Sequence, residues 1–226
     1  MRTLVLASAS PARLRLLQMA GVDPAVRVSD VDEAAVLADF RASPGHTAAP
    51  TSPEIADLLA AVKAHAVAFS ARGDPQLSAA LVVGCDSMLE WNGQAWGKPE
   101  NADAARKRLR AMRGTSGILH TGHCVIDLVS GRALNELAST VVHFGSVSDA
   151  EIDAYVATGE PLNVAGSFTL DGLSAPFIDG IEGDPSNVIG LSLPLLRRLL
   201  RDLGVAWPDL WRHDAKPPEA APENRR

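Results

Sequence analysis

The chain has 226 residues, of which 46% are hydrophobic, and carries a formal net charge of −6 at pH 7. This length and composition suit one large α/β domain or two small ones with a buried core. The negative charge argues against a general nucleic-acid coat, because phosphate backbones reward broad positive surfaces. No run approaches the roughly 20 apolar residues that span a bilayer, and residues 1–20 lack a signal-peptide pattern. We therefore expect a cytoplasmic protein that contacts neither nucleic acid nor membrane.

The first predicted unit is a short apolar strand that leads into a helix. Ser10 is the expected N-cap, Pro11 the first helical residue, and Gly21 follows the end of the helix. Unpaired backbone N–H groups, the hydroxyls of Ser8 and Ser10 and the guanidinium of Arg13 would then surround one point. Such a point attracts anions, although many helices that begin with Ser-Pro bind nothing.

A long helix and a hairpin are expected next. After the first unit we predict a strand at 26–29, followed by a segment that contains Glu33, and a loop at 43–51. A helix from Thr51 to about Arg72 and a strand at 81–85 come next. The strand at 81–85 ends at Asp86. The dipeptide Asn92-Gly93 then predicts a hairpin turn. This turn would bring Lys98 back to the neighbourhood of Asp86.

The second half of the chain alternates helices with a long β-ribbon. We predict a helix from a cap at Asn101 to Gly114, a ribbon at 118–145 that turns at 130–131, a helix from Ser148 to Gly159, an irregular stretch at 160–183 with a strand at 177–178, and a helix at 194–203. Cys85 and Cys124 are too few for a disulfide framework and are expected to fill the core. Residues 1–208 would form one α/β domain with two lobes, and 209–226 a disordered tail.

Two acidic residues are candidates for chemistry. Asp86 follows a buried strand, where ligands of open α/β sheets usually bind, and Gly84 and the returning Lys98 flank it. The plain alternative is a turn or cap residue. Glu33 could join Asp86, although alone it would be an ordinary acid at a helix N-terminus.

The basic candidates are Arg13, Lys63 and Lys98. Lys63 interrupts an almost uncharged helical segment, so its ammonium either extends to solvent or meets a charged partner. Lys98 lies between Gly97 and Pro99, whose rigid, small surroundings would place its side chain well, although a surface turn would look the same.

Two further features are weaker candidates. His120 and His123 are three residues apart in a predicted strand, which places them on opposite faces and makes them poor metal co-ligands. A basic helix carries Arg106, Lys107, Arg108, Arg110 and Arg113, with 106, 110 and 113 on one face. A solvated face is the default for such a helix; contact with a nucleotide or a partner, such as a second copy in a homodimer, is the alternative.

Several separated blocks of the chain resemble the Maf family of nucleotide pyrophosphatases. The matching blocks are Ala7-Ser8-x-Ser10-Pro11-x-Arg13, Asp32-Glu33, Ala61-x-Lys63-Ala64, Gly84-x-Asp86, Gly97-Lys98-Pro99, Gly159-Glu160-Pro161, Ala165-Gly166 and Ser186-Asn187-Val188-x-Gly190-Leu191. The resemblance spans roughly residues 4–200. It implies a mixed, elongated β-sheet flanked by helices, with two lobes and a nucleotide cleft between them, as in inosine triphosphate pyrophosphatases.

The resemblance also implies a reaction and a set of site residues. The reaction is hydrolysis of a nucleoside triphosphate to the monophosphate and pyrophosphate, as housecleaning of the nucleotide pool, with a divalent cation such as Mg²⁺ or Mn²⁺. Asp86 occupies the position of the catalytic acid, and Ser8, Arg13, Glu33, Lys63 and Lys98 match substrate-pocket residues, with Ser10 beside them. Glu33 and Asp86 would be the metal ligands, and which of them acts as the base stays open.

Three positions distinguish this chain from family members that select thymidine and uridine triphosphates. The family's arginine, threonine and glutamine at these specificity positions are Ala12, Ser87 and Asp171 here. We therefore expect a different base preference. The branch selective for 7-methylguanosine triphosphate has a bulky residue in place of Ala12, so it does not match either.

Two rival functions remain at this level. A non-enzymatic nucleotide-binding regulator of cell division and septum formation would bind without turnover. A haloacid-dehalogenase-type phosphatase would use Asp86 as a nucleophile, but that class needs a second aspartate two residues on, where this chain has Met88.

Overall fold

The computed structural model describes residues 2–44 and 48–212. The helices and strands are β1 (Leu4–Leu6), α1 (Pro11–Met19), β2 (Ala25–Val26), α2 (Glu33–Ala42), α3 (Ser52–Ala71), β3 (Leu81–Trp91), β4 (Gln94–Trp96), α4 (Ala102–Met112), β5 (Ser116–Asp127), β6 (Ala133–Phe144), α5 (Asp149–Ala157), β7 (Ile178–Glu182), α6 (Pro185–Ile189) and α7 (Leu193–Asp202). Short 3₁₀ helices are η1 (Glu160–Asn163), η2 (Ala165–Ser167), η3 (Ala175–Phe177) and η4 (Trp207–Leu210).

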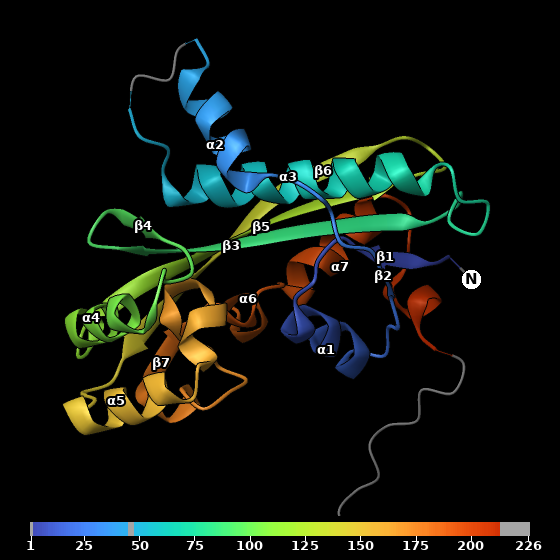
Figure 1. Cartoon of the computed structure of the whole chain (residues 1–226). Helices are drawn as coiled ribbons and strands as arrows, with labels where there is room; N and C mark the ends of the chain where they lie inside the picture. The colour runs from blue at the N-terminus through green and yellow to red at the C-terminus, as the bar shows by residue number, and fades with distance from the viewer. Residues whose placement is uncertain (1, 45–47, 213–226) are drawn as a thin grey trace, which may run out of the picture.

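One mixed sheet organises the molecule. In the described part of the chain it has seven strands in the order β2-β1-β3-β5-β6-β7, and β4 pairs with the far end of β3. Strand β1 runs parallel to β2 and β3, whereas the other pairs are antiparallel. The predicted mixed sheet with flanking helices is confirmed (Figure 1).

Helices cover both faces of this sheet. Helix α3 lies along one face of β3 and β5, α1 and α7 lie on the other, and α4 and α5 gather at the far end (Figure 1). Alternate residues of each strand therefore enter different cores: Leu6 packs with Leu196 on the α7 side, whereas Val5 and Val82 pack with Ala64 of α3. Strand β3 accordingly directs Val82, Gly84 and Asp86 toward α3.

The predicted helix caps and the predicted hairpin turn are present in the structure. Ser10 Oγ accepts a hydrogen bond from the N–H of Arg13, and Thr51 and Ser148 each form a complete capping box. At the β3–β4 turn Asn92 and Gly93 adopt φ values of 50° and 70°, which is the geometry that Asn-Gly favours in tight hairpins.

The structure corrects two predicted boundaries early in the chain. The strand predicted at 26–29 is β2, which ends at Val26, and the segment after it leads into α2, which the pattern did not predict. Asp32 caps α2, but none of the helix's residues is buried, so it lacks the continuous apolar stripe that would have identified it. Residues 45–47 of the predicted loop lie outside the described residues.

Two later boundaries also move. Strand β3 does not end at Asp86 but continues to Trp91, so Asp86 lies in mid-strand and pairs with Gly122 of β5. The expected tail starts at 209, yet Leu210 is buried in the α7 core and Trp211 forms a bridge with Val22. The remainder of that tail, 213–226, lies outside the described residues. Within the part of the chain that is described, no helix is both long and apolar enough to cross a membrane.

Candidate functional site

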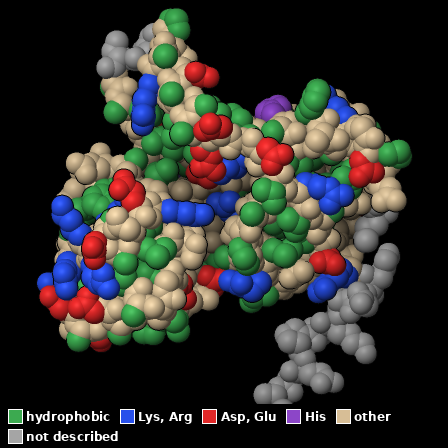
Figure 2. Space-filling model, in the orientation of Figure 1, with side chains coloured by type: hydrophobic (Ala, Val, Ile, Leu, Met, Phe, Trp, Pro, Cys, Tyr) green, Lys and Arg blue, Asp and Glu red, His purple; other side chains and the backbone are tan. Residues whose placement is uncertain are grey.

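Lys63 links the two acidic candidates. Its Nζ lies 2.6 Å from Asp86 Oδ1 and 2.7 Å from Glu33 Oε1. The side chains of Lys63 and Asp86 are each 13% exposed, whereas that of Glu33 is 51% exposed. Of the two alternatives for Lys63, the structure therefore selects the charged partner over extension to solvent. In Figure 2 basic and acidic side chains meet in the middle of the visible face, beneath the projecting helix α2.

Two glycines bring Lys63 over Asp86. A Cβ at Gly84 would lie 2.4 Å from the carbonyl oxygen of Ala60, and one at Gly122 would lie 2.3 Å from that of Ala56. The backbone of α3 therefore rests directly on β3 and β5 where these strands have no side chain. One turn beyond this contact, Lys63 reaches the carboxylate that follows Gly84 by two residues.

Asp86 is a buried acid that contacts a cation. Burial raises its pKa above the usual range, while the charges of Lys63 and Arg13 oppose the shift and Glu33 reinforces it. The neighbouring Cys85 thiol is fully buried, which raises its pKa to about 12. Both cysteines are buried free thiols, so they fill the core as predicted.

Arg13 is buried beneath the same strand and is held from several sides. Its Nε donates to the carbonyl of Gly190 (2.7 Å), and Nη1 donates to the carbonyl of Cys85 (2.8 Å) and to Ser8 Oγ (3.0 Å). Nη2 donates to Ser87 Oγ (3.1 Å). Four of the five guanidinium N–H groups are thus used within the protein, so Arg13 is a fixed positive charge rather than a mobile arm.

These contacts fix the direction of the nearby hydroxyl protons. Ser8 Oγ accepts from Nη1 of Arg13 and from the N–H of Ser10 (3.2 Å). No described residue accepts the hydroxyl proton of Ser8. Thr121 Oγ1 donates to the carbonyl of Asn187 (3.2 Å), so at the 3.0 Å contact between Ser87 and Thr121 it is Ser87 that donates. The hydroxyl of Ser8 can therefore donate to a bound ligand, whereas the hydroxyl of Ser87 already donates to Thr121.

Lys98 follows the β4 strand that turns back along β3. Trp96 pairs with Leu89, and a Cβ at Gly97 would lie 3.7 Å from Met88 Sδ. The turn that leaves β4 therefore lies against Met88 of β3, and Lys98 in this turn is exposed and forms no hydrogen bond or ion pair with any described residue. It does not contact Asp86.

The three predicted specificity positions lie in different settings. Ala12 is half-buried in the first turn of α1, and Ser87 belongs to the Arg13 network. Asp171 accepts from Thr169 Oγ1 (2.6 Å) and from Nη2 of Arg15 (2.7 Å). Burial raises the pKa of Asp171, but these two hydrogen bonds outweigh it and lower the pKa below its usual value.

Sequence reasoning missed three of these partners. Thr121 and Asn187 lie in a strand and a short helix that are far from the other site residues in sequence. Arg15 lies on α1, and nothing in its sequence surroundings indicated a contact with Asp171. The Nδ2 of buried Asn187 donates to the carbonyl of Leu119 and to Thr140 Oγ1, which fixes α6 to the β-ribbon. The Ser-Asn-Val block contained this residue, but nothing in its spacing indicated a structural role.

The histidine pair lies as predicted on opposite faces. His120 contacts Glu90 and Ser139, whereas Nε2 of His123 accepts from the N–H of Ser192 at the start of α7. Burial lowers the pKa of His123 to about 4, so at ordinary pH it is a neutral acceptor for the N–H of Ser192, which is the N-cap of α7.

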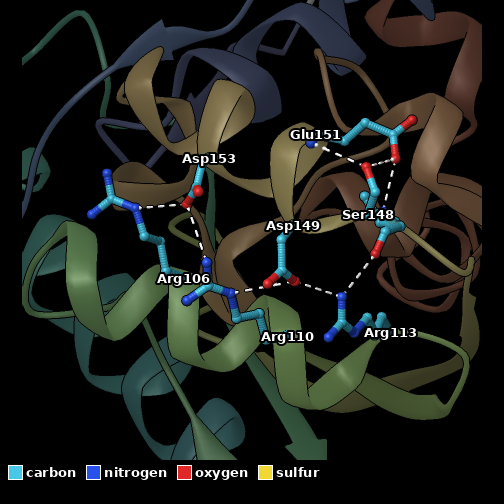
Figure 3. Close-up of polar contacts among 8 residues, drawn as sticks. Arg106, Arg110, Arg113, Ser148, Asp149, Glu151 and Asp153 are labelled. Atoms are coloured by element: carbon cyan, nitrogen blue, oxygen red, sulfur yellow. Dashed lines mark hydrogen bonds and ion pairs between the residues drawn. The ribbon is translucent and has the colours of Figure 1, made fainter.

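The basic face of α4 is not simply solvated. Arg106 and Arg110 pair with Asp153, and Arg110 and Arg113 pair with Asp149 (Figure 3). These acids come from α5, so the predicted solvated face is a network of partly exposed ion pairs between two helices. Such pairs typically contribute less than about 1 kcal/mol each.

The chain is similar to known proteins over most of its length. The family model described as Maf-like protein matches residues 3–203. A protein of Streptomyces coelicolor named "Nucleoside triphosphate pyrophosphatase" is 59% identical over 93% of this chain and 95% of its own length. Proteins of the same name from Streptomyces avermitilis and Nocardia farcinica are each 54% identical, over 93% and 95% of this chain and 95% and 99% of their own lengths.

Proposed function

The chain belongs to the Maf-like protein family, and on this basis we propose that it hydrolyses a nucleoside triphosphate to the monophosphate and pyrophosphate. The observation that carries the proposal is the Glu33–Lys63–Asp86 cluster, together with the hydroxyl of Ser8, whose proton has no acceptor among the described residues. It combines a buried carboxylate, a cation and a hydrogen-bond donor. This is the set that phosphoryl transfer with an anionic leaving group needs.

The residues would divide the reaction between them. Asp86 accepts a proton from the water whose oxygen attacks the α-phosphorus, and the bond from this phosphorus to the bridging oxygen breaks as pyrophosphate leaves. Negative charge then grows on the β- and γ-phosphate oxygens, where Lys63, Lys98 and the Ser8 hydroxyl stabilise it. Arg13 contributes its charge from beneath the strand while holding Ser8 in place.

The two carboxylates also suit a divalent cation such as Mg²⁺ or Mn²⁺. Glu33 and Asp86 each contact the ammonium of Lys63, and because carboxylates are preferred ligands of both ions, these two residues would hold the cation. No group of three or more His, Cys, Asp or Glu residues is placed for a metal within the described ranges, so phosphate oxygens and water would complete the coordination. When bound, the cation supplies positive charge to the phosphate oxygens and makes water more acidic.

We propose further that the base preference is not for thymidine or uridine triphosphate, and that the protein removes unwanted nucleotides from the pool. The Ser87 hydroxyl donates inward to Thr121, and both oxygens of Asp171 are bonded to Arg15 and Thr169. Ser87 lacks the methyl group of the threonine that it replaces, and the Asp171 carboxylate lacks the N–H donors of the glutamine amide.

The test is incubation of the purified protein with Mg²⁺ and a panel of normal and modified triphosphates, with pyrophosphate and orthophosphate separated. We expect monophosphate and pyrophosphate, with thymidine and uridine triphosphates among the poor substrates. Release of orthophosphate and a nucleoside diphosphate would contradict the reaction. Tight binding of nucleotides without turnover would instead support a regulator of cell division and septum formation.

The Ser8 hydroxyl gives a first prediction. Ser8→Ala removes a donor that faces no acceptor among the described residues, and we expect kcat/KM to fall about tenfold, the usual effect of losing one hydrogen bond to a charged group. Steady-state kinetics on the best triphosphate measures this. Ser78→Ala, which removes an exposed hydroxyl that donates to the carbonyl of Pro75, should leave kcat/KM unchanged. Equal kinetics for both variants would exclude Ser8 from the site.

The pKa of Asp86 gives a second prediction. Burial raises this pKa, and the active form of a base is the ionised one, so kcat/KM should decline on acidification at a higher pH than for an ordinary aspartate. Lys63→Gln removes the largest opposing charge and should move the acid limb of the residual activity to still higher pH. The pH profile of kcat/KM measures both, with Lys107→Gln as the control. A shift toward lower pH in Lys63→Gln would contradict the assignment.

A further inference from the structure

Arg108 differs from the arginines that surround it on α4. Arg106, Arg110 and Arg113 turn toward the acids of α5 (Figure 3). Arg108 instead donates from Nη1 to the carbonyl of Gly97 at 2.8 Å. Its guanidinium carbon also lies 4.8 Å from the centre of the Trp96 ring, a cation–π distance.

These contacts join others at the turn that leaves β4. The carbonyl of Gly97 accepts a second hydrogen bond, from the N–H of Gly166 at 3.2 Å. Trp96 packs edge-on against Trp91, with ring centres 5.7 Å apart. The end of β4 is therefore held by α4, by η2 and by β3 at once.

Lys98 is the next residue, and its backbone has little freedom. The peptide before it is fixed by the two hydrogen bonds on the Gly97 carbonyl, and the buried Pro99 after it restricts its ψ angle. Its side chain contacts no charged partner among the described residues. A long cation on a rigid turn loses less conformational freedom when it binds an anion than one on a mobile turn does.

We propose that Arg108 is a positioning residue that fixes the turn at Gly97, Lys98 and Pro99 and so aims Lys98 at the phosphate groups of a triphosphate. The proposal rests on the function proposed above. Arg108 does not contact the phosphate groups. It acts on the reaction only by holding the Gly97 carbonyl and the Trp96 ring.

The test compares Arg108→Gln, Arg108→Lys, Lys98→Ala and the matched control Arg110→Gln, which removes a charge from the same helix. We expect Arg108→Gln to raise KM for the triphosphate about tenfold with a smaller change in kcat, and to add nothing when Lys98 is already alanine. Arg108→Lys keeps one donor and the cation over Trp96, so it should recover most of the loss. Arg110→Gln should resemble the wild type.

Two readouts do not depend on turnover. Calorimetry with inorganic triphosphate and Mg²⁺ should show about tenfold weaker binding in Arg108→Gln than in Arg110→Gln. Hydrogen exchange should show a faster amide at Gly166 in Arg108→Gln alone. Together they separate the two proposals, because a wild type that hydrolyses no triphosphate would remove the proposed function, whereas these signatures report on the turn itself. The role of Arg108 would be overturned if Arg108→Gln left the exchange rate of the Gly166 amide unchanged. It would also be overturned if the KM of the double variant rose by the full product of the two single effects.

Discussion

Asp86→Asn is expected to lower kcat by about a thousandfold while leaving the protein folded. An asparagine keeps the size of the side chain and still accepts a hydrogen bond from Lys63, but it cannot take a proton from water. Loss of a positioned general base typically costs a factor of about 10² to 10⁴. The measurement is product-resolved steady-state kinetics on the best triphosphate, at a pH where the wild type is fully active.

The stability of the same variant separates a chemical effect from a structural one. Because burial raises the pKa of Asp86, the ionised carboxylate is less favourable in the folded chain than in the unfolded chain above that pKa. Asp86→Asn removes this cost, and Lys63 keeps its 2.7 Å contact with Glu33, so we expect unfolding at the same or a higher temperature. Asp57→Asn, on the adjoining helix α3, should change neither activity nor unfolding appreciably. Full activity in Asp86→Asn would remove it as the base.

The parts of the fold set by neighbouring residues could be predicted from the sequence. The cap at Ser10, the capping boxes at Thr51 and Ser148 and the turn at Asn92-Gly93 all depend on groups within four residues of one another. Such rules act wherever the residues occur. Helix α2 escaped prediction because it has a cap but no buried residue.

The residues of the site could be predicted from the sequence, but the hydrogen bonds between them could not. The residues from Ser8 to Lys98 were identified from blocks and from the expected end of a strand, and the structure does bring Lys63 between Glu33 and Asp86. Arg13, however, was expected to be an open phosphate ligand, and its hydrogen bonds to Cys85 and Gly190 depend on contacts that cross 72 and 177 residues. Long-range packing of this kind leaves no periodic pattern in the sequence.

The approach of α3 to the sheet sets the site's geometry, and Gly84→Ala tests it. The added Cβ would lie 2.4 Å from the carbonyl oxygen of Ala60 and 2.8 Å from the backbone nitrogen of Ala64. Neither atom belongs to a flexible side chain, so the helix itself must move away from β3. Forcing extra volume into a packed core costs about 1 to 3 kcal/mol, and we expect the upper end of this range in the free energy of unfolding, measured with denaturant.

The same shift should reach Lys63, which lies between Ala60 and Ala64 on α3. A displacement of about 1 Å from productive geometry can cost about a hundredfold in rate, so kcat/KM of Gly84→Ala should fall by that factor even where the protein remains folded. Gly73→Ala is the matched control, because a Cβ there would make only an ordinary 3.6 Å contact with the carbonyl of Ser70. If Gly84→Ala lost stability but kept its kcat/KM, the distance between α3 and β3 would not determine how Lys63 meets Asp86. A loss of both would show that a glycine with no functional group of its own sets how Lys63 meets Asp86.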